Sequence, residues 1–329
     1  MTTTAVSESI EQFRDRFVRI TREVSRRIVG HEDIVNLTVT SLLAGGHVLL
    51  EGIPGVGKTS LVHTLADVLH LTFNRIQFTP DLMPADIVGT NIVQEHAHGG
   101  TFFEFQPGPI FANVVLADEI NRATPKTQSA LLEAMQDVSV SVGKTTYKLD
   151  QPFFVMATQN PLEMEGTYPL PEAQLDRFFF KLKVMYPPEE AMHQILERTT
   201  RDFDSAVTRV VDGPGLLEMR QVARAVAISR PVQAYAIRMT LGTHPDSPYA
   251  SALVKRYVRY GASPRAAQAL VLAAKIQALN RGEGFVSIDD VRAVALPALR
   301  HRILLNFEGE ADEVNTDAIV NELLSTVAS

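Results

Sequence analysis

The chain has 329 residues, 45% of them hydrophobic, and a formal net charge of −7 from 31 Lys and Arg against 38 Asp and Glu. This length and composition suit two domains with their own cores and exclude a disordered chain, while the negative charge excludes a bulk positive field for nucleic acid or anionic lipid. The absence of cysteine excludes disulfides and thiolate metal sites. With no basic leader and no apolar run long enough to cross a bilayer, we expect a cytoplasmic protein without membrane insertion.

The chain opens with two predicted helices. Apolar residues repeat at helical spacing over 10–24, and Ser9 with Gln12 fits a capping box, so we expect the first helix to start at Ser9 and to end near Gly30. The second helix is expected over 33–43, where a Gly-Gly pair follows as a stop signal. The turn between the two helices is expected to lie near the loop that comes next.

A buried strand over 47–51 is predicted to lead into the run Gly52-Ile53-Pro54-Gly55-Val56-Gly57-Lys58-Thr59. This G-x-x-x-x-G-K-T pattern is typical of a phosphate-binding loop, in which Gly55 and Gly57 let backbone N–H groups turn inward around a polyphosphate. The helix that follows would point its N-terminus at the same anion, with Lys58 reaching the β- and γ-phosphates and Thr59 able to ligate Mg²⁺. The sequence therefore predicts nucleotide binding rather than a plain glycine-rich turn.

Further strands and turns follow this loop. A strand is predicted over 73–79, and the patterns of 91–106 and 138–149 indicate two hairpins. Between the hairpins, Thr124-Pro125 fits the N-cap and the first position of a helix. These elements are those of a mixed α/β domain.

Acidic residues end the next predicted strand. The apolar run 114–117 is typical of a fully buried parallel strand, and Asp118 and Glu119 come directly after it in a Walker B pattern. Asp118 could hold Mg²⁺ and Glu119 could orient and deprotonate the water that attacks the γ-phosphate. Paired acids can instead cap a turn, but their position after a phosphate loop favours catalysis.

A polar residue also follows the buried strand predicted over 153–158. Asn160 lies at the carboxyl end of this strand, where ligands bind in open α/β sheets, and it is a candidate for positioning water. Asn before Pro also commonly starts a turn, and the residues alone do not separate the two interpretations.

The composition changes after a last strand over 179–184. Pro187-Pro188 marks the predicted boundary between a core domain, 1–188, and a second domain, 189–329, which is helical apart from an extended segment around 202–211. The predicted helices there cover 191–199, 216–228, 232–244, 263–279, 288–302 and 316–325. Ser263-Pro264 fits an N-cap and first helical position, which places Arg265 in a first turn where the helix dipole disfavours a cation. Arg265 is either solvated or directed at a nucleotide phosphate.

Taken together, these motifs resemble the ordered motifs of the AAA+ ATPases, and in detail those of the MoxR family. The matching runs are Gly52 to Thr59, Leu116-Ala117-Asp118-Glu119-Ile120-Asn121-Arg122-Ala123, Ala157-Thr158-Gln159-Asn160-Pro161, Glu172-Ala173-Gln174-Leu175-Asp176-Arg177-Phe178 and Gly261 to Arg265. The resemblance implies an α/β fold, namely an αβα core with a five-stranded parallel sheet, an inserted hairpin near 91–106 and an all-helical lid.

The resemblance also implies roles for single residues. Glu119 is implied as the Walker B base, Asn160 as sensor 1, Arg177 as an arginine finger and Arg265 as sensor 2. The predicted ATP-binding residues are Val29, Gly30, Gly52, Pro54, Gly55, Val56, Gly57, Lys58, Thr59, Ser60 and Asp118, and the predicted Mg²⁺ ligands are Thr59 and Asp118. A finger implies a ring, generally hexameric, in which Arg177 reaches the neighbour's γ-phosphate, with Arg122 as a rival. His31 departs from the Gln that related ATPases often carry there, which leaves the fine shape of the adenine pocket open.

Three functions are compatible with such a motor. The leading hypothesis is a chaperone-like ATPase that remodels partner complexes, often together with von Willebrand factor A domain proteins. A nucleic-acid motor is the second, but the 91–106 hairpin has Glu95 and Glu104 and no Lys or Arg, and the other hairpin offers only Lys144 and Lys148. The third is a chelatase-like subunit, for which His96-Ala97-His98 is a weak metal-binding pattern.

Overall fold

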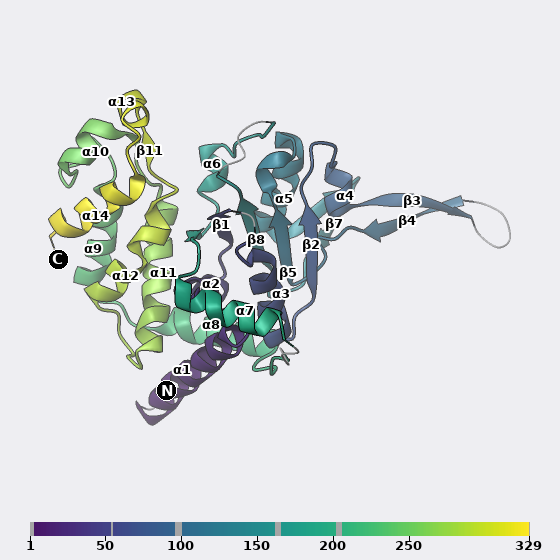
Figure 1. Cartoon of the computed structure of the whole chain (residues 1–329), viewed down its shortest axis with the longest axis horizontal. Coiled ribbons are helices and arrows are strands. Elements are labelled where there is room, and N and C mark those ends of the chain that lie inside the picture. The colour runs from purple at the N-terminus through teal and green to yellow at the C-terminus, as the bar shows by residue number, and fades with distance from the viewer. Residues whose placement is uncertain (1–2, 54, 96–100, 162–165, 202–205, 329) are drawn as a thin grey trace.

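A computed structural model describes the chain except for residues 1–2, 54, 96–100, 162–165, 202–205 and 329 (Figure 1). A five-stranded parallel sheet lies at its centre, as predicted. In spatial order the strands are β2 (Phe73–Gln77), β5 (Val114–Asp118), β8 (Phe154–Gln159), β1 (Val48–Gly52) and β9 (Phe180–Val184). All five therefore end at the same edge of the sheet.

Alternate residues of these strands enter two separate cores, because successive side chains of a strand point to opposite faces. Val48 and Leu50 of β1 lie in one core, and Leu49 lies in the other. The first core includes residues of α1 (Thr3–Ser25), α2 (Glu32–Ala44) and α3 (Lys58–Val68), and the second includes residues of α5 (Pro125–Asp137). The sheet is thus covered on both faces, as the apolar character of its strands requires.

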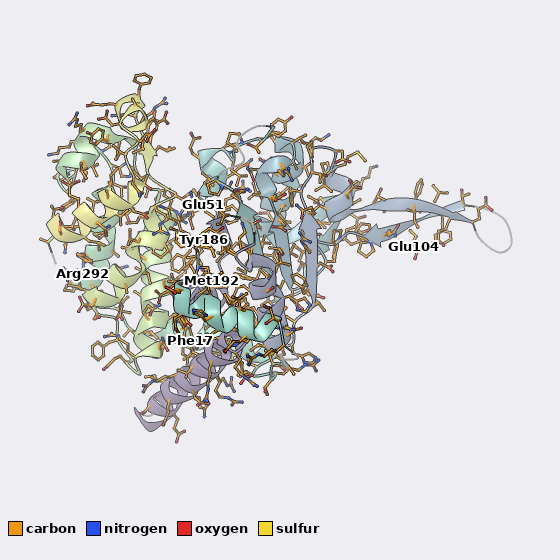
Figure 2. All side chains as sticks on the ribbon, in the orientation of Figure 1. Phe17, Glu51, Glu104, Tyr186, Met192 and Arg292 are labelled. Atoms are coloured by element: carbon orange, nitrogen blue, oxygen red, sulfur yellow. The ribbon has the colours of Figure 1, made fainter. Side chains whose placement is uncertain are left out.

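Two hairpins extend the core domain, both close to their predicted positions. They pair β3 (Gly89–Glu95) with β4 (Thr101–Pro107), and β6 (Ser139–Val142) with β7 (Thr145–Lys148). The first hairpin projects far from the body of the molecule, on the side opposite the C-terminal helices (Figure 1). It carries the Glu104 side chain out on this arm (Figure 2). The short helices α4 (Pro84–Val88), η1 (Ile120–Arg122) and α6 (Glu172–Leu175) complete this part of the chain.

The C-terminal half is built mainly from helices, as predicted. They are α7 (Glu189–Thr199), α8 (Gly213–Ala225), α9 (Arg230–Leu241), α10 (Ala252–Tyr257), α11 (Pro264–Asn280), α12 (Ile288–Leu299), α13 (Phe307–Ala311) and α14 (Thr316–Thr326). Residues 206–212 have no regular structure. Helix α8 packs against α1 and α2, α11 packs against α1, α2 and α8, and α12 packs against β9, so the edge of the sheet at β9 is covered.

The structure differs from expectation in a few elements. The predicted start of the first helix at Ser9 was wrong, since α1 begins by Thr3 and ends at Ser25. The capping pattern lies inside the helix, where the helical backbone itself supplies the hydrogen bonds. The structure also adds the small antiparallel pair of β10 (Val258–Tyr260) and β11 (Leu304–Leu305) to the helical half. Among the described residues, no helix combines the length and apolar character that crossing a bilayer requires.

Candidate functional site

The carboxyl edge of the sheet gathers most of the predicted site residues. Strand β1 lies between β8 and β9, and Glu51 of β1 lies opposite Gln159 of β8. The next strand, β5, pairs with β8 and ends at Asp118. Adjacent strands are about 4.8 Å apart, so the phosphate-binding loop, Asn160 and the acidic pair follow one another along this edge. Glu51 and Tyr186, labelled in Figure 2, mark the ends of β1 and β9 there.

The glycines of the loop have the backbone that a phosphate cradle needs. Gly55 and Gly57 have φ of 84° and 83°, in the left-handed region that favours glycine, and a Cβ at either position would meet nothing within 4 Å. The space beside the loop backbone is therefore open. Gly57 is also the N-cap of α3, whose first residue, Lys58, donates from Nζ to the carbonyl of Gly52 at 2.6 Å. Pro54 lies outside the described residues.

A cavity of about 460 Å³ lies beside the first turn of α3 and is lined by Thr59, Ser60 and His63 of that helix, with Arg27 and Arg198. The predicted turn before α2 also lies near the loop, because the His31 ring hydrogen-bonds to the backbone of Val56. Burial lowers the pKa of His31, which favours the neutral imidazole. The loop, the cavity and this turn, which includes Val29 and Gly30, form one region.

Asp118 is held by groups from both neighbouring strands. Thr158 Oγ1 of β8 donates to Asp118 Oδ1 at 2.6 Å, and Arg75 of β2 donates to Oδ2 from Nε at 3.1 Å and from Nη2 at 2.6 Å. The carboxylate is nearly buried, at 9% relative exposure for the residue, and a cation already balances its charge. A carboxylate that pairs with a cation in this way is also a suitable ligand for Mg²⁺, which is commonly held by one or two carboxylates and by water.

Glu119 has an unusual backbone and a fixed carboxylate. Its φ is 57°, in the left-handed region that non-glycine residues seldom adopt, and its N–H donates to Thr158 Oγ1 at 2.8 Å. Its Oε2 accepts from Gln77 Nε2 and from Arg122 Nη1, both at 2.9 Å. Arg122, the rival finger, is therefore bonded to the Walker B carboxylate of its own chain.

Two polar residues of β2 were missed at this edge. Arg75 contacts Asp118 and Gln77 contacts Glu119, and Arg75 Nη2 also donates to Gln77 Oε1 at 2.6 Å. Their spacing of two on a strand would have placed both on one face. That this face meets the acidic pair depends on the pairing of β2 with β5, which local sequence does not reveal.

Arg177 and Arg265 lie elsewhere, at the amino edge of the sheet. The backbone N–H of Phe179 donates to the carbonyl of His47 at 2.8 Å, so the segment that carries Arg177 lies where β1 and β9 begin. Arg177 Nη1 donates to the carbonyl of Leu132 at 2.7 Å. The five residues of β1 separate this edge from the phosphate loop by about 16 Å.

Arg265 contacts Asp176, the residue that directly precedes Arg177. Arg265 Nη1 donates to Asp176 Oδ2 at 3.1 Å, and the N-cap Ser263 donates to both carboxylate oxygens at 2.9 and 2.8 Å. Burial alone would raise the pKa of Asp176, but the Ser263 hydrogen bonds and the charge of Arg302 outweigh it and lower that pKa. Arg177, Arg265 and Asp176 line a second cavity of about 390 Å³.

Comparison with known proteins agrees with this architecture. Residues 47–180 match the ATPase family associated with various cellular activities (AAA), and residues 250–323 match the AAA lid domain. The chain is 45% identical to Chaperone MoxR1 of Mycobacterium tuberculosis, over 93% of this chain and 80% of that protein. It is 29% identical to Protein MoxR of Methylorubrum extorquens, over 97% of this chain and 95% of that protein.

The chain belongs to the MoxR family of AAA+ ATPases. A solved structure from Cytophaga hutchinsonii is also similar, with a TM-score of 0.91, 41% sequence identity and coverage of 99% of this chain and 98% of that one. The family membership and the AAA+ fold expected from the motifs are thus confirmed.

Among the described residues of this MoxR-family chain, no group of three or more His, Asp and Glu side chains could hold a metal ion. His96-Ala97-His98, the weak metal-binding pattern, lies outside the described residues. The Asp118 site does not depend on such a group, because Mg²⁺ keeps several of its waters.

Proposed function

We propose that this MoxR-family protein binds ATP with Mg²⁺ at the carboxyl edge of the sheet and hydrolyses it in a ring, to remodel partner proteins. The observation that carries the proposal is the separation of two sets of residues on opposite edges of one sheet. Lys58, Asp118 and Glu119 lie at one edge and Arg177 and Arg265 at the other, so two subunits are needed to bring both sets to one nucleotide.

Each residue of the carboxyl edge has a proposed part in the reaction. The loop N–H groups and Lys58 would hold the phosphates, which requires Lys58 to leave the Gly52 carbonyl. Mg²⁺, held by Thr59 and Asp118, would neutralise phosphate charge. Glu119 would take the proton of the attacking water while Asn160 orients that water. The bonds of Gln77 and Arg122 to Glu119 support this role, because they fix the carboxylate at the edge.

The amino edge would serve the neighbouring subunit. Arg177 and Arg265 would stabilise the charge that develops on the neighbour's γ-phosphate, where such a group is worth about 10³–10⁵ in rate. The bond of Arg122 to Glu119 of its own chain supports Arg177 rather than Arg122 as the finger. A head-to-tail contact of this kind forms a ring when its rotation closes, and we propose a closed ring of six subunits.

The chaperone part of the proposal rests on a relative and on family membership. The relative named Chaperone MoxR1 covers most of this chain. By analogy, the substrate would be a protein complex, and a von Willebrand factor A domain protein is the proposed partner. No feature of the described residues favours a nucleic-acid motor or a metal chelatase instead.

Replacing Glu119 tests hydrolysis directly. Glu119→Gln should bind ATP as the wild type does and lose about 10²–10⁴ in turnover, because the amide cannot accept the proton. Phosphate release and binding of a fluorescent ATP analogue measure the two effects. Glu11→Gln, at an exposed position of α1, is the matched control and should retain both ATP binding and turnover. Full turnover by Glu119→Gln would remove Glu119 as the base.

Mixed subunits test the shared site. Arg177→Ala and Lys58→Ala should each be inactive alone, while mixtures should regain activity because an intact loop can then face an intact finger. Phosphate release across a series of mixing ratios measures the rescue. If no ratio restores activity, Arg177 does not act between subunits.

A further inference from the structure

Arg302, a residue outside the motifs of the sequence analysis, occupies an unusual position between the two halves of the chain. It follows α12, and its side chain is only 3% exposed. All five guanidinium donors are used. Nε donates to Asp176 Oδ1 at 2.9 Å, Nη1 donates to the carbonyls of Phe179 at 3.2 Å and Ala298, and Nη2 donates to the carbonyls of Asp176 at 3.1 Å and Phe178 at 2.6 Å.

The acceptors of Arg302 surround the finger. The carbonyls of Asp176, Phe178 and Phe179 belong to the residue before Arg177 and the two residues after it. His301, from the same turn as Arg302, also contacts this segment. Its Nε2 lies 3.0 Å from the Phe178 carbonyl, so Nε2 must carry the proton in order to donate to that carbonyl. The backbone that carries Arg177 is therefore held from the helical half.

The same arrangement holds Arg265. Asp176 accepts from Arg302 at one carboxylate oxygen and from Arg265 at the other, while Ser263 at the start of α11 donates to both. One carboxylate thus joins the start of α11, the end of α12 and the finger segment. Since a planar guanidinium with five fixed donors cannot satisfy these acceptors in a second orientation, the cluster favours a single geometry.

We infer that Arg302 is a positioning residue, which holds Arg177 and Arg265 as one preassembled unit for the nucleotide site of the neighbouring subunit. The inference rests on the proposed function, because it assumes that both arginines act between subunits. Arg302 is buried and would not touch the nucleotide. Its effect would come from the placement of Arg177, for which a shift of about 1 Å can cost about 100-fold in rate.

The test uses Arg302→Lys, which keeps the charge but offers three donors in place of five. The matched control is Arg300→Lys, since Arg300 lies on the same turn and is also largely buried. It pairs with Asp317 within the helical half and donates to the Lys181 carbonyl of β9, without a hydrogen bond to the finger segment. We expect Arg302→Lys to lower kcat by about 10- to 100-fold with ATP binding unchanged, and Arg300→Lys to lower it less than about twofold.

Mixing experiments separate positioning from general damage. Arg302→Lys subunits mixed with Lys58→Ala subunits should regain activity, since the Lys58→Ala subunit supplies a correctly held finger. Arg302→Lys mixed with Arg177→Ala should regain none. If Lys58→Ala subunits rescue Arg177→Ala but not Arg302→Lys, the inference about Arg302 is wrong while the shared site stands. If they do not rescue Arg177→Ala, the proposed shared site itself is wrong.

A second variant covers the case in which Arg302→Lys folds poorly. Asp176→Asn keeps the size of the side chain and weakens its bonds to Arg302 and Arg265. If the melting temperature of Arg302→Lys falls far below that of Arg300→Lys, the same mixing series is made with Asp176→Asn. A kcat loss that Lys58→Ala subunits rescue supports the inference, and wild-type kcat in Asp176→Asn overturns it.

Discussion

At the scale of single residues, His47 shows how a buried polar group organises the amino edge. Its ring lies between α5 and β8, with Nε2 3.1 Å from the Met135 carbonyl and Nδ1 accepting from the Val155 N–H at 3.0 Å. These partners require the proton on Nε2. Burial lowers the pKa of His47 to about 4, so the ring is neutral in the folded protein near pH 7.

This pKa predicts a loss of stability in mild acid. An unfolded His binds a proton below about pH 6.5, but folded His47 does not until about pH 4, so stability falls as the pH falls through this window. For His47 alone the loss between pH 7 and pH 5 is about 2 kcal/mol. Urea unfolding at the two pH values measures it.

The control for this prediction replaces the titrating ring. His47→Asn keeps an oxygen that can accept from the Val155 N–H, and it should show a smaller difference between the two pH values. Part of the difference should remain, because burial also lowers the pKa of His301. An unchanged pH difference in His47→Asn would contradict the assignment.

At the scale of elements, the two hairpins support each other through aromatic contacts. Phe105 of β4 stacks on Tyr147 of β7 with ring centroids 3.9 Å apart, and both rings also contact Phe111. On the same face of the arm, Phe103 is 77% exposed. The arm is therefore attached at its base and exposes aromatic surface farther out.

Loss of the Phe105 ring should loosen the arm. Phe105→Ala is expected to cost about 1 kcal/mol of local stability, the usual value of an aromatic pair beyond its buried area, and to speed amide exchange in β3 and β4 about fivefold or more. Hydrogen exchange measured by mass spectrometry reports this. Phe103→Ala is the matched control on the same strand and should leave exchange unchanged, and equal exchange in the two variants would contradict the role of the Phe105 stack.

Local sequence signals predicted some of the site residues and short strands and missed others. The phosphate loop, Asp118 and Asn160 were found because each lies at the end of a strand that has its own local signal. Arg75 and Arg302 were not, because their roles depend on contacts with residues 43 and 126 positions away, respectively. The strands β10 and β11 were missed for the same reason, being three and two residues long and stabilised by their mutual pairing.

At the scale of the whole molecule, charge bears on the choice of substrate. The net charge of −7 leaves no general attraction to nucleic acid, and Glu95 and Glu104 place acids on the projecting arm. Contact with DNA through this arm would bring like charges together. A protein substrate is free of this penalty.

Single- or double-stranded DNA should therefore not stimulate the ATPase. The expected change at physiological salt is less than about twofold, since the phosphate contacts that drive such binding need Lys and Arg. Phosphate release with and without DNA at two salt concentrations measures it. A large stimulation that weakens as salt rises would favour the nucleic-acid motor.

The separation of the two edges of the sheet has a consequence for how activity should vary with concentration. On the proposed function, each subunit contributes the phosphate-binding part of one site at its carboxyl edge and the arginines of another site at its amino edge. An isolated subunit therefore has no complete site. An open row of subunits has one complete site fewer than it has subunits, and only closure of the ring equalises the two numbers. ATP turnover per subunit should consequently rise steeply over the concentration range in which rings form, and then become constant.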